Sequence, residues 1–200
     1  MKMGWLMGWA VPESWFAPLV GEAFPDARHT FVAATPGALD RLETAGPFDV
    51  VVGYSLGAEL LLAAGERVSA WGRIALLAPV LAFPREEDLG GRVARTQVKQ
   101  LARWLKRDPA AALADFYQRA GLDVTVNVPG STEKLLWGLE QLEILRVEPP
   151  LPAGWRAWCG AEDALLDAAR LHALVPEIRL VPGATHHPAK LLCSLAEELK

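Results

Sequence analysis

A series of short, almost uninterrupted apolar segments is the feature that most constrains the fold of this chain. Six such segments occur, at residues 3–7, 30–34, 50–54, 74–80, 155–159 and 178–181. Their apolar residues are continuous rather than alternating, which is the pattern of parallel strands covered on both faces. We therefore expect a mostly parallel β-sheet with both faces buried.

Segments with helical character separate these apolar runs. Residues 56–68 are rich in Leu and Ala, residues 164–174 carry apolar side chains at helical spacing, and residues 188–199 form the last such segment. This alternation favours an α/β architecture with helices flanking the sheet. The 200 residues are 52% hydrophobic, which suits one domain with a sizeable core and excludes a disordered or fibrous chain.

The alternation stops between the fourth and fifth apolar runs. Helical patterns occupy residues 92–106, 110–120 and 132–145, and only the short stretch 124–128 has strand character. We expect residues 84–148 to form a small helical cap over an active site. The cap is an insertion in a single domain of residues 1–200, not a second domain.

The pentapeptide Gly53-Tyr54-Ser55-Leu56-Gly57 matches G-x-S-x-G. It follows an apolar run and precedes a Leu- and Ala-rich segment, the strand–turn–helix context that gives this motif its meaning. The small residues at 53 and 57 permit a sharp turn that holds the Ser55 hydroxyl clear of the sheet, at the positive end of a helix. We predict Ser55 as a nucleophile; the alternative is an unreactive serine in a glycine-rich turn.

A serine hydroxyl needs a general base to become a good nucleophile. His186 and His187 lie in the loop 182–188, after the last apolar run. Loops at the carboxyl ends of parallel strands are where such a sheet assembles its site. We favour His186 as the base, with His187 as the alternative, and expect His29 and His172 to have surface or packing roles.

The base in turn needs an acid that fixes its tautomer. Asp163 follows the run 155–159 and is our choice, with Glu162 and Asp167 as alternatives. The order Ser, Asp, His is that of the α/β-hydrolases.

The developing negative charge on the substrate needs backbone N–H donors. We expect one from Leu56, the residue after the nucleophile, and one from Trp9 in the loop after the first run. The alternative for Trp9 is a packing role in the core.

The chain resembles the α/β-hydrolases and, more narrowly, the pimeloyl-[acyl-carrier-protein] methyl ester esterases of biotin synthesis. The similar segments are 8–9 with 15–19 (the H-G-W-G … W-x-P-L opening), 54–57 (W/Y-S-L-G), 108–109 with 115–121 (the cap), 138–142 with 149–151 (G-L-x-x-L … P-L) and 182–188 (the histidine loop). In that loop the family's catalytic histidine stands two residues before the proline, which corresponds to His186.

The resemblance implies an α/β-hydrolase fold in which Ser55, Asp163 and His186 form a triad. It also implies an oxyanion hole of the Trp9 and Leu56 amides, and an acyl pocket lined by Trp9, Leu56 and Phe116. The implied reaction removes a methyl ester from carrier-bound pimelate through an acyl-serine. Two departures stand out: the family's histidine before Gly-Trp is Met7, and the first run corresponds to the family's third strand, so we expect no leading edge hairpin.

A run of basic residues lies within the expected cap. Between residues 91 and 107 there is no acidic residue, and the basic ones are Arg92, Arg95, Lys99, Arg103, Lys106 and Arg107. The steps of 3, 4, 4 and 3 residues from Arg92 to Lys106 place those five on one helix face. We call this set the basic stripe. The formal charge of the chain is −4, so the stripe reverses the local sign and could steer an acidic carrier protein to Arg92, Arg95, Lys99 and Arg103. The alternative is a solvated amphipathic helix.

The net charge, the apolar run lengths and the cysteine count exclude several classes of function. A net charge of −4 argues against nucleic acid as a partner, and no apolar run approaches the roughly 20 residues of a membrane span. No metal-ligand cluster or phosphate-binding glycine loop occurs, so we expect neither a metal nor another cofactor. The two cysteines, Cys159 and Cys193, suit a reducing compartment.

We therefore expect a cytoplasmic, monomeric serine esterase that acts on a small acyl ester. The alternatives are a generalist short-chain carboxylesterase or thioesterase, and a non-catalytic scaffold with the same fold.

Overall fold

The computed structural model describes residues 1–126 and 131–200. These residues contain one sheet of six strands, paired in parallel in the order β2-β1-β3-β4-β5-β6. The strands are β1 (Lys2–Leu6), β2 (Arg28–Val32), β3 (Val50–Tyr54), β4 (Arg73–Leu77), β5 (Arg156–Gly160) and β6 (Ile178–Val181). All six apolar runs thus form strands, and each pairing between neighbouring strands is parallel.

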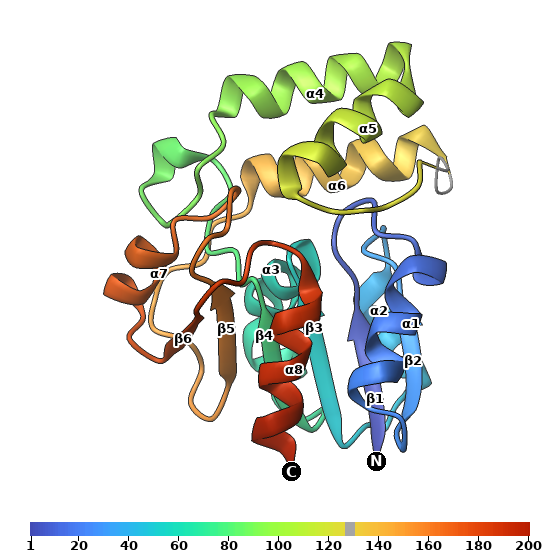
Figure 1. Cartoon of the computed structure of the whole chain (residues 1–200), viewed down its shortest axis with the longest axis vertical. Coiled ribbons are helices and arrows are strands. Elements are labelled where there is room, and N and C mark those ends of the chain that lie inside the picture. Colours follow the sequence, from blue (N-terminus) through green and yellow to red (C-terminus); the bar gives the residue numbers. More distant parts are fainter. Residues whose placement is uncertain (127–130) are drawn as a thin grey trace.

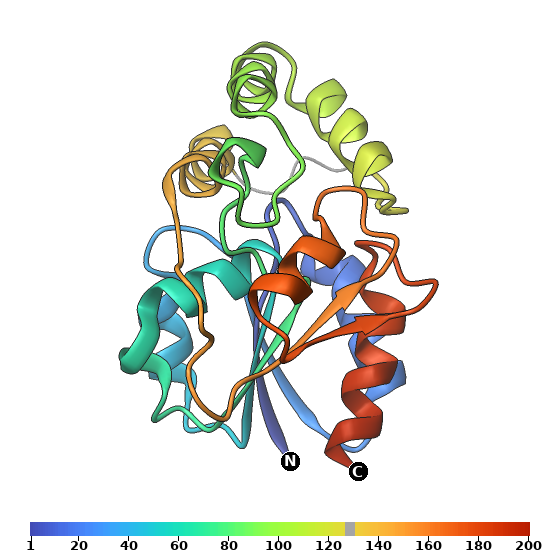
Figure 2. The ribbon, with the colours of Figure 1, turned by 90° about the vertical axis from the view of Figure 1, so that its left-hand side faces the viewer.

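Helices cover both faces of the sheet (Figures 1 and 2). Helices α1 (Glu13–Ala23) and α8 (Pro188–Leu199) pack together on one face, and α2 (Ala38–Ala45) and α3 (Leu56–Ala64) lie on the other. Helix α7 (Ala168–Leu174) packs against β6. The core lies between these layers, where β3 is buried at every residue. No helix of the described residues is long and apolar enough to cross a membrane.

Two of these helices were not expected from the sequence. Helix α1 contains Pro18, which ordinarily argues against a helix interior, yet Phe16 and Val20 on either side of it are buried against the sheet. Helix α2 has only eight residues and follows Gly37 in a left-handed conformation. Tertiary packing forms both helices where the local pattern is weak. The expected helix 56–68 is α3 followed by a 3₁₀ turn, η1 (Gly65–Val68).

Three further helices form a layer above the carboxyl ends of the strands (Figure 1). They are α4 (Arg95–Arg107), α5 (Pro109–Ala120) and α6 (Thr132–Ile144), and we call them the cap helices. A short 3₁₀ turn, η2 (Arg85–Glu87), precedes them. Helix α4 contacts α5 and α6, and α6 rests on α3. The expected strand at 124–128 is absent over residues 124–126, which have no neighbouring strand to pair with; the rest of it lies outside the described residues.

The order of the strands determines where a ligand-binding site can form in this sheet. Strand β1 lies between β2 and β3, so the chain leaves β1 toward one side of the sheet and β3 toward the other. In open parallel sheets, ligands bind at such a switch point, outside the carboxyl ends of the strands. The segments that follow β1 and β3 carry Trp9 and Ser55.

Candidate active site

Ser55 occupies a sharp turn between β3 and α3. Its backbone has φ 53° and ψ −117°, a conformation that residues other than glycine seldom adopt. Backbone strain of this kind occurs mainly at functional sites. The flanking glycines make the turn possible. A Cβ on Gly57 would lie 1.9 Å from the Leu6 carbonyl oxygen, and one on Gly53 would lie 2.6 Å from the Ala58 Cα. Both glycines of the motif are therefore required by close backbone approach.

The structure brings together Ser55, His186 and Asp163. His186 Nε2 lies 3.0 Å from the Ser55 hydroxyl, and His186 Nδ1 lies 2.8 Å from Asp163 Oδ2. Ser55 is 8% exposed, and the other two are 1% exposed. If Nδ1 carries the proton and donates it to Asp163, Nε2 is free to accept the proton of the Ser55 hydroxyl. A nucleophile, its base and an orienting acid require contacts of this kind.

The acid is itself held by the backbone. Asp163 Oδ1 accepts hydrogen bonds from the N–H groups of Leu165 at 2.8 Å and Leu166 at 3.0 Å. Only Oδ2 therefore faces the histidine. The two alternative acids lie elsewhere: Glu162 is exposed, and Asp167 caps the N-terminus of α7 by accepting from the N–H of Arg170.

The other histidines have different contacts. The His187 backbone N–H donates to Thr185 Oγ1. Its ring Nδ1 accepts from the Ala189 N–H at the start of α8, and its Nε2 lies 3.1 Å from Asp123 Oδ1. His29 contacts Trp5 Nε1 and the Phe24 carbonyl. His172 contacts the Ile178 carbonyl. Each of these three rings therefore has a structural partner away from the serine.

Tyr54 fixes the histidine loop, a role that we did not derive from the sequence. Its buried hydroxyl donates a 2.8 Å hydrogen bond to the His186 carbonyl oxygen, and its ring lies 5.6 Å from the His186 ring. Burial, with a smaller effect from the Asp163 charge, raises the pKa of Tyr54 well above its ordinary value, so the phenol stays a donor. A tyrosine at the end of an apolar strand was the available signal, because a buried hydroxyl needs a partner.

The proposed oxyanion donors sit on the two segments that flank the switch point. In the described part of the chain, neither the Trp9 N–H nor the Leu56 N–H donates a hydrogen bond to the protein. Leu56 is the first residue of α3, where the N–H groups have no partner within the helix and the helix dipole favours negative charge. Both donors thus remain available for a ligand.

The three residues expected to line an acyl pocket gather where the cap helices meet the segments after β1 and β3, and Phe116 belongs to the cap helix α5. The Trp9 and Phe116 rings meet edge to face, with centroids 4.6 Å apart. A Cβ on Gly138 of α6 would lie 2.4 Å from Trp9 Cδ1 and 3.3 Å from Leu56 Cδ2. Trp9 and Leu56 are therefore packed against the same point of α6.

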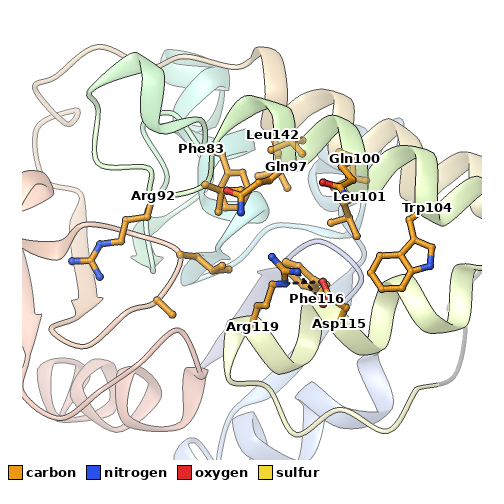
Figure 3. A pocket seen from close by; sticks show the side chains of 15 residues that line it. Phe83, Arg92, Gln97, Gln100, Leu101, Trp104, Asp115, Phe116, Arg119 and Leu142 are labelled. Carbon is orange, nitrogen blue, oxygen red and sulfur yellow. Dashed lines mark hydrogen bonds and ion pairs between the residues drawn. The ribbon is translucent and has the colours of Figure 1, made fainter.

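A cavity of about 470 Å³ opens between α4 and α5, beside this cluster (Figure 3). Its volume is in the range of ligand-binding pockets. Leu101, Leu139 and Phe116 give it apolar walls, and Gln97 and Arg119 add polar groups. Ser55 does not line it. The cavity approaches the site through Phe116, which packs on Trp9, and through Leu165, whose N–H holds Asp163.

A second cavity, of about 570 Å³, lies on the other side of the Trp9 loop and is lined by residues 7–13, 31–36 and 41, with Lys134 and Leu135. It also lacks Ser55. The first cavity reaches the site through Phe116 and through Leu165, whose N–H bonds to Asp163, whereas the second reaches it through Trp9. We favour the first cavity for an acyl group because Phe116 lines it.

The basic stripe is partly engaged in contacts within the protein. Arg92 donates to the Asp163 carbonyl oxygen at 2.9 Å. Arg95 pairs with Glu87 and donates to the Glu143 carbonyl oxygen, and Lys99 lies 3.2 Å from the Glu143 carboxylate. Arg103 is exposed, with no ion pair to any described residue. Helix α4 begins at Arg95, so Arg92 lies outside it, in contrast to the expected helix 92–106, and supports the segment that carries Asp163.

Glu59 is an unusual feature of the helix that begins at the nucleophile. It is fully buried, and neither carboxyl oxygen has a hydrogen-bond partner among the described residues. Burial raises the pKa of Glu59 well above its ordinary value of 4.5, because a buried site without a partner disfavours the charged carboxylate. Within the described residues, no group of three or more His, Cys, Asp or Glu side chains could hold a metal ion.

Comparison with known proteins gives matches at the level of structure alone. No family model matches the sequence, and no curated protein matches it. An esterase from Exiguobacterium antarcticum has a TM-score of 0.71 at 12% identity, over 100% of this chain and 90% of that one.

Two further structures illustrate the range of these neighbours. A thioesterase of the prodiginine pathway in Streptomyces coelicolor has a TM-score of 0.58 at 15% identity, over 98% of this chain and 85% of that one. An esterase from a Rhodococcus species has a TM-score of 0.53 at 14% identity, over 100% and 88% of the two chains. At these identities the likeness establishes the fold, and the fold is that of the α/β-hydrolases.

Proposed function

We propose that this protein is a serine hydrolase that cleaves carboxylic esters through an acyl-serine intermediate. The observation that carries the proposal is the continuous chain of contacts from the Ser55 hydroxyl through His186 to Asp163. Esterases and a thioesterase among the structural neighbours support it. Since a fold by itself does not define chemistry, the contacts at Ser55 are the main argument.

The proposed reaction has two halves. Ser55 Oγ attacks the ester carbonyl while His186 Nε2 takes its proton, and the carbonyl oxygen becomes an oxyanion facing the Trp9 and Leu56 N–H groups. The carbon–oxygen bond of the ester then breaks, and His186 gives the proton to the departing alcohol. Water attacks the acyl-serine, losing a proton to His186, and the acid is released as Ser55 regains that proton.

Preorganised donors at the oxyanion are the largest expected contribution to the rate. The turn at Ser55 supports this step, since it places the first N–H groups of α3 beside the nucleophile. Cap residues 84–148 would exclude water and bound the acyl group. We propose Trp9, Leu56 and Phe116 as the walls nearest the reacting carbonyl, with the 470 Å³ cavity beyond Phe116.

The finer proposal is that the substrate is the methyl ester of pimeloyl-acyl-carrier protein, as in biotin biosynthesis. The sequence resemblance supports it, and a cavity with apolar walls suits an acyl chain. Docking of an acidic carrier would fall to the basic stripe. Since Arg95 and Lys99 pair with acidic side chains of the protein, the exposed Arg103, Lys106 and Arg107 are the more available part of that stripe.

The first experiment compares hydrolysis of p-nitrophenyl acetate by the wild type and by Ser55→Ala, with Ser69→Ala as an exposed-serine control. We expect kcat to fall by about 10⁶-fold in Ser55→Ala and to be unchanged in the control. Equal activity in the wild type and Ser55→Ala would refute the proposed mechanism.

The second experiment compares kcat/KM for carrier-bound methyl pimelate, a free methyl ester and an acyl thioester. A large preference for the carrier-bound ester, reduced by Arg103→Glu with Lys106→Glu, is the result that the finer proposal predicts. Equal kcat/KM for the free ester would indicate a generalist esterase, and a preference for the thioester a thioesterase. Loss of activity on free and carrier-bound esters alike would refute docking at the stripe.

A further inference from the structure

The loop that carries the Trp9 amide has a backbone conformation that needs external support. This loop, residues 8–10, follows β1, and Ala10 has φ 57°, a left-handed conformation that is strained for a residue other than glycine. The backbone near this loop makes few hydrogen bonds among the described residues: the Met7 N–H bonds to the Val32 carbonyl oxygen, and the Val11 N–H to the Gly8 carbonyl oxygen at a long 3.4 Å. Met7 itself is buried and has no side-chain N–H or O–H donor.

The cap helices supply the contacts that the sheet does not. Tyr117 of α5 donates a buried 2.6 Å hydrogen bond to the Ala10 carbonyl oxygen. That oxygen accepts no other hydrogen bond from the described residues. Burial raises the pKa of Tyr117 to about 12, so its hydroxyl remains protonated and can donate at any pH at which the protein is assayed.

The Trp9 side chain is fixed by the same layer. Its Nε1 donates a buried 2.8 Å hydrogen bond to the Leu135 carbonyl oxygen of α6. Its ring packs edge to face on Phe116, the residue before Tyr117. The missing Cβ of Gly138 leaves the space that the ring fills, since a Cβ there would lie 2.4 Å from Trp9 Cδ1. The main chain at Ala10 and the side chain of Trp9 are thus both fixed by contacts with the cap helices α5 and α6.

We propose that Tyr117 is a positioning residue that holds the oxyanion loop in its catalytic conformation, so that the cap helices complete the oxyanion hole. This inference rests on the proposed function, because the loop matters only if the Trp9 amide stabilises an oxyanion. Its consequence is that the oxyanion hole is complete only while α5 and α6 occupy the position seen in the structure.

Tyr117→Phe removes one oxygen atom and leaves the ring in place. Deleting an oxyanion donor outright costs about 10²–10³-fold in kcat, and here the donor is displaced rather than deleted. We therefore expect kcat for p-nitrophenyl acetate to fall about 10- to 100-fold, with KM changed less than twofold, since this acyl group is too short to use the cavity. Affinity for a trifluoromethyl ketone, whose adduct places an alkoxide at the oxyanion position, should fall by the same factor as kcat/KM.

Asp108→Ala is the matched control on the same helix. Asp108 Oδ1 accepts from the Ala111 N–H and caps α5, so its loss destabilises that helix without touching the loop. It should lower the melting temperature at least as far as Tyr117→Phe and leave kcat within twofold of the wild type. Trp9→Phe, which loses the bond to Leu135, is a second test of the same loop and should also lower kcat more than KM.

The inference is overturned if Tyr117→Phe keeps kcat and trifluoromethyl ketone affinity within twofold of the wild type, or if Asp108→Ala lowers both as much. Ser55→Ala, assayed in parallel, separates this outcome from failure of the proposed function. If Ser55→Ala abolishes activity and Tyr117→Phe does not change it, only the role of Tyr117 is refuted. If Ser55→Ala is active, the proposed function itself fails.

Discussion

Replacement of Asp163 by Asn isolates the role of the acid, because the structure dictates how the amide must sit. Asp163 Oδ1 accepts two backbone N–H bonds, from Leu165 and Leu166. An Asn side chain keeps both bonds only if its carbonyl oxygen takes the Oδ1 position. Its NH₂ group then faces His186 Nδ1, where the carboxylate oxygen now lies at 2.8 Å. The amide donates, so Nδ1 must accept, and the proton moves to Nε2.

A histidine protonated at Nε2 cannot accept the proton of Ser55. The wrong tautomer costs about 10⁴-fold in kcat in enzymes of this mechanism, which corresponds to about 5 kcal/mol of transition-state stabilisation. We expect the same for Asp163→Asn, with little change in KM. Because the backbone bonds are kept, the melting temperature should change little.

The assay is steady-state hydrolysis of p-nitrophenyl acetate, with thermal unfolding of the same preparations. Glu162→Gln is the matched control, since it makes the same chemical change at an exposed neighbouring carboxylate, and it should leave kcat unaltered. A fall of less than tenfold in Asp163→Asn, with the fold intact, would refute the tautomer argument. A similar loss in Glu162→Gln would point to the wrong acid.

Three further predictions, which use four substitutions, follow from the contacts described above. His187→Ala should lower kcat less than tenfold, whereas His186→Ala should lower it by at least 10⁴-fold; the reverse order in parallel kinetics would identify the other ring as the base. Tyr54→Phe leaves the His186 carbonyl without its donor and should lower the free energy of unfolding by about 1–3 kcal/mol, measured by urea titration; no change would contradict the role given to that hydroxyl. Glu59→Leu should raise the free energy of unfolding and alter its pH dependence. Because burial raises the pKa of Glu59 above 4.5, the folded protein holds a proton that the unfolded chain releases above that pH, so Glu59 lowers stability progressively as pH rises from about 4.5 toward the raised folded value. The stabilising effect of Glu59→Leu should therefore be larger at pH 7 than at pH 5, and an equal or smaller effect at pH 7 would refute it.

The sequence predicts the nucleophile turn well because its determinants are local. Two glycines, one serine and the flanking strand and helix lie within a short stretch of chain, and close backbone approach explains each small residue. The six strands were also predicted, since apolar runs of that length report burial directly. The ends of four strands differ from the expected ones by one to three residues, because hydrogen bonding rather than hydropathy sets where a strand stops.

The support around the site was not predictable in the same way. Tyr117 and Ala10 are 107 residues apart, and no local pattern pairs a cap tyrosine with a loop after the first strand. The signal that existed was general: a hydroxyl on the otherwise apolar, buried face of a helix needs a hydrogen-bond partner.

The ion pairs of the basic stripe were also not predictable from the local sequence. Spacing within one helix indicates a shared face, but the acidic partners Glu87 and Glu143 lie in η2 and α6. The sequence pattern indicated a uniformly positive surface, whereas the folded chain neutralises part of it. Only the tertiary arrangement decides which of these cations face solvent.

The most direct test of the proposed function is covalent labelling with a fluorophosphonate, followed by mass spectrometry of the digested protein. An activated serine forms a phosphonyl ester with this reagent, and an ordinary serine does not. We predict stoichiometric modification of Ser55 in the wild type, no modification in Ser55→Ala, and a greatly slowed reaction in His186→Ala. Failure of the wild-type protein to react, or reaction at a different residue, would contradict the assignment of Ser55 as the nucleophile.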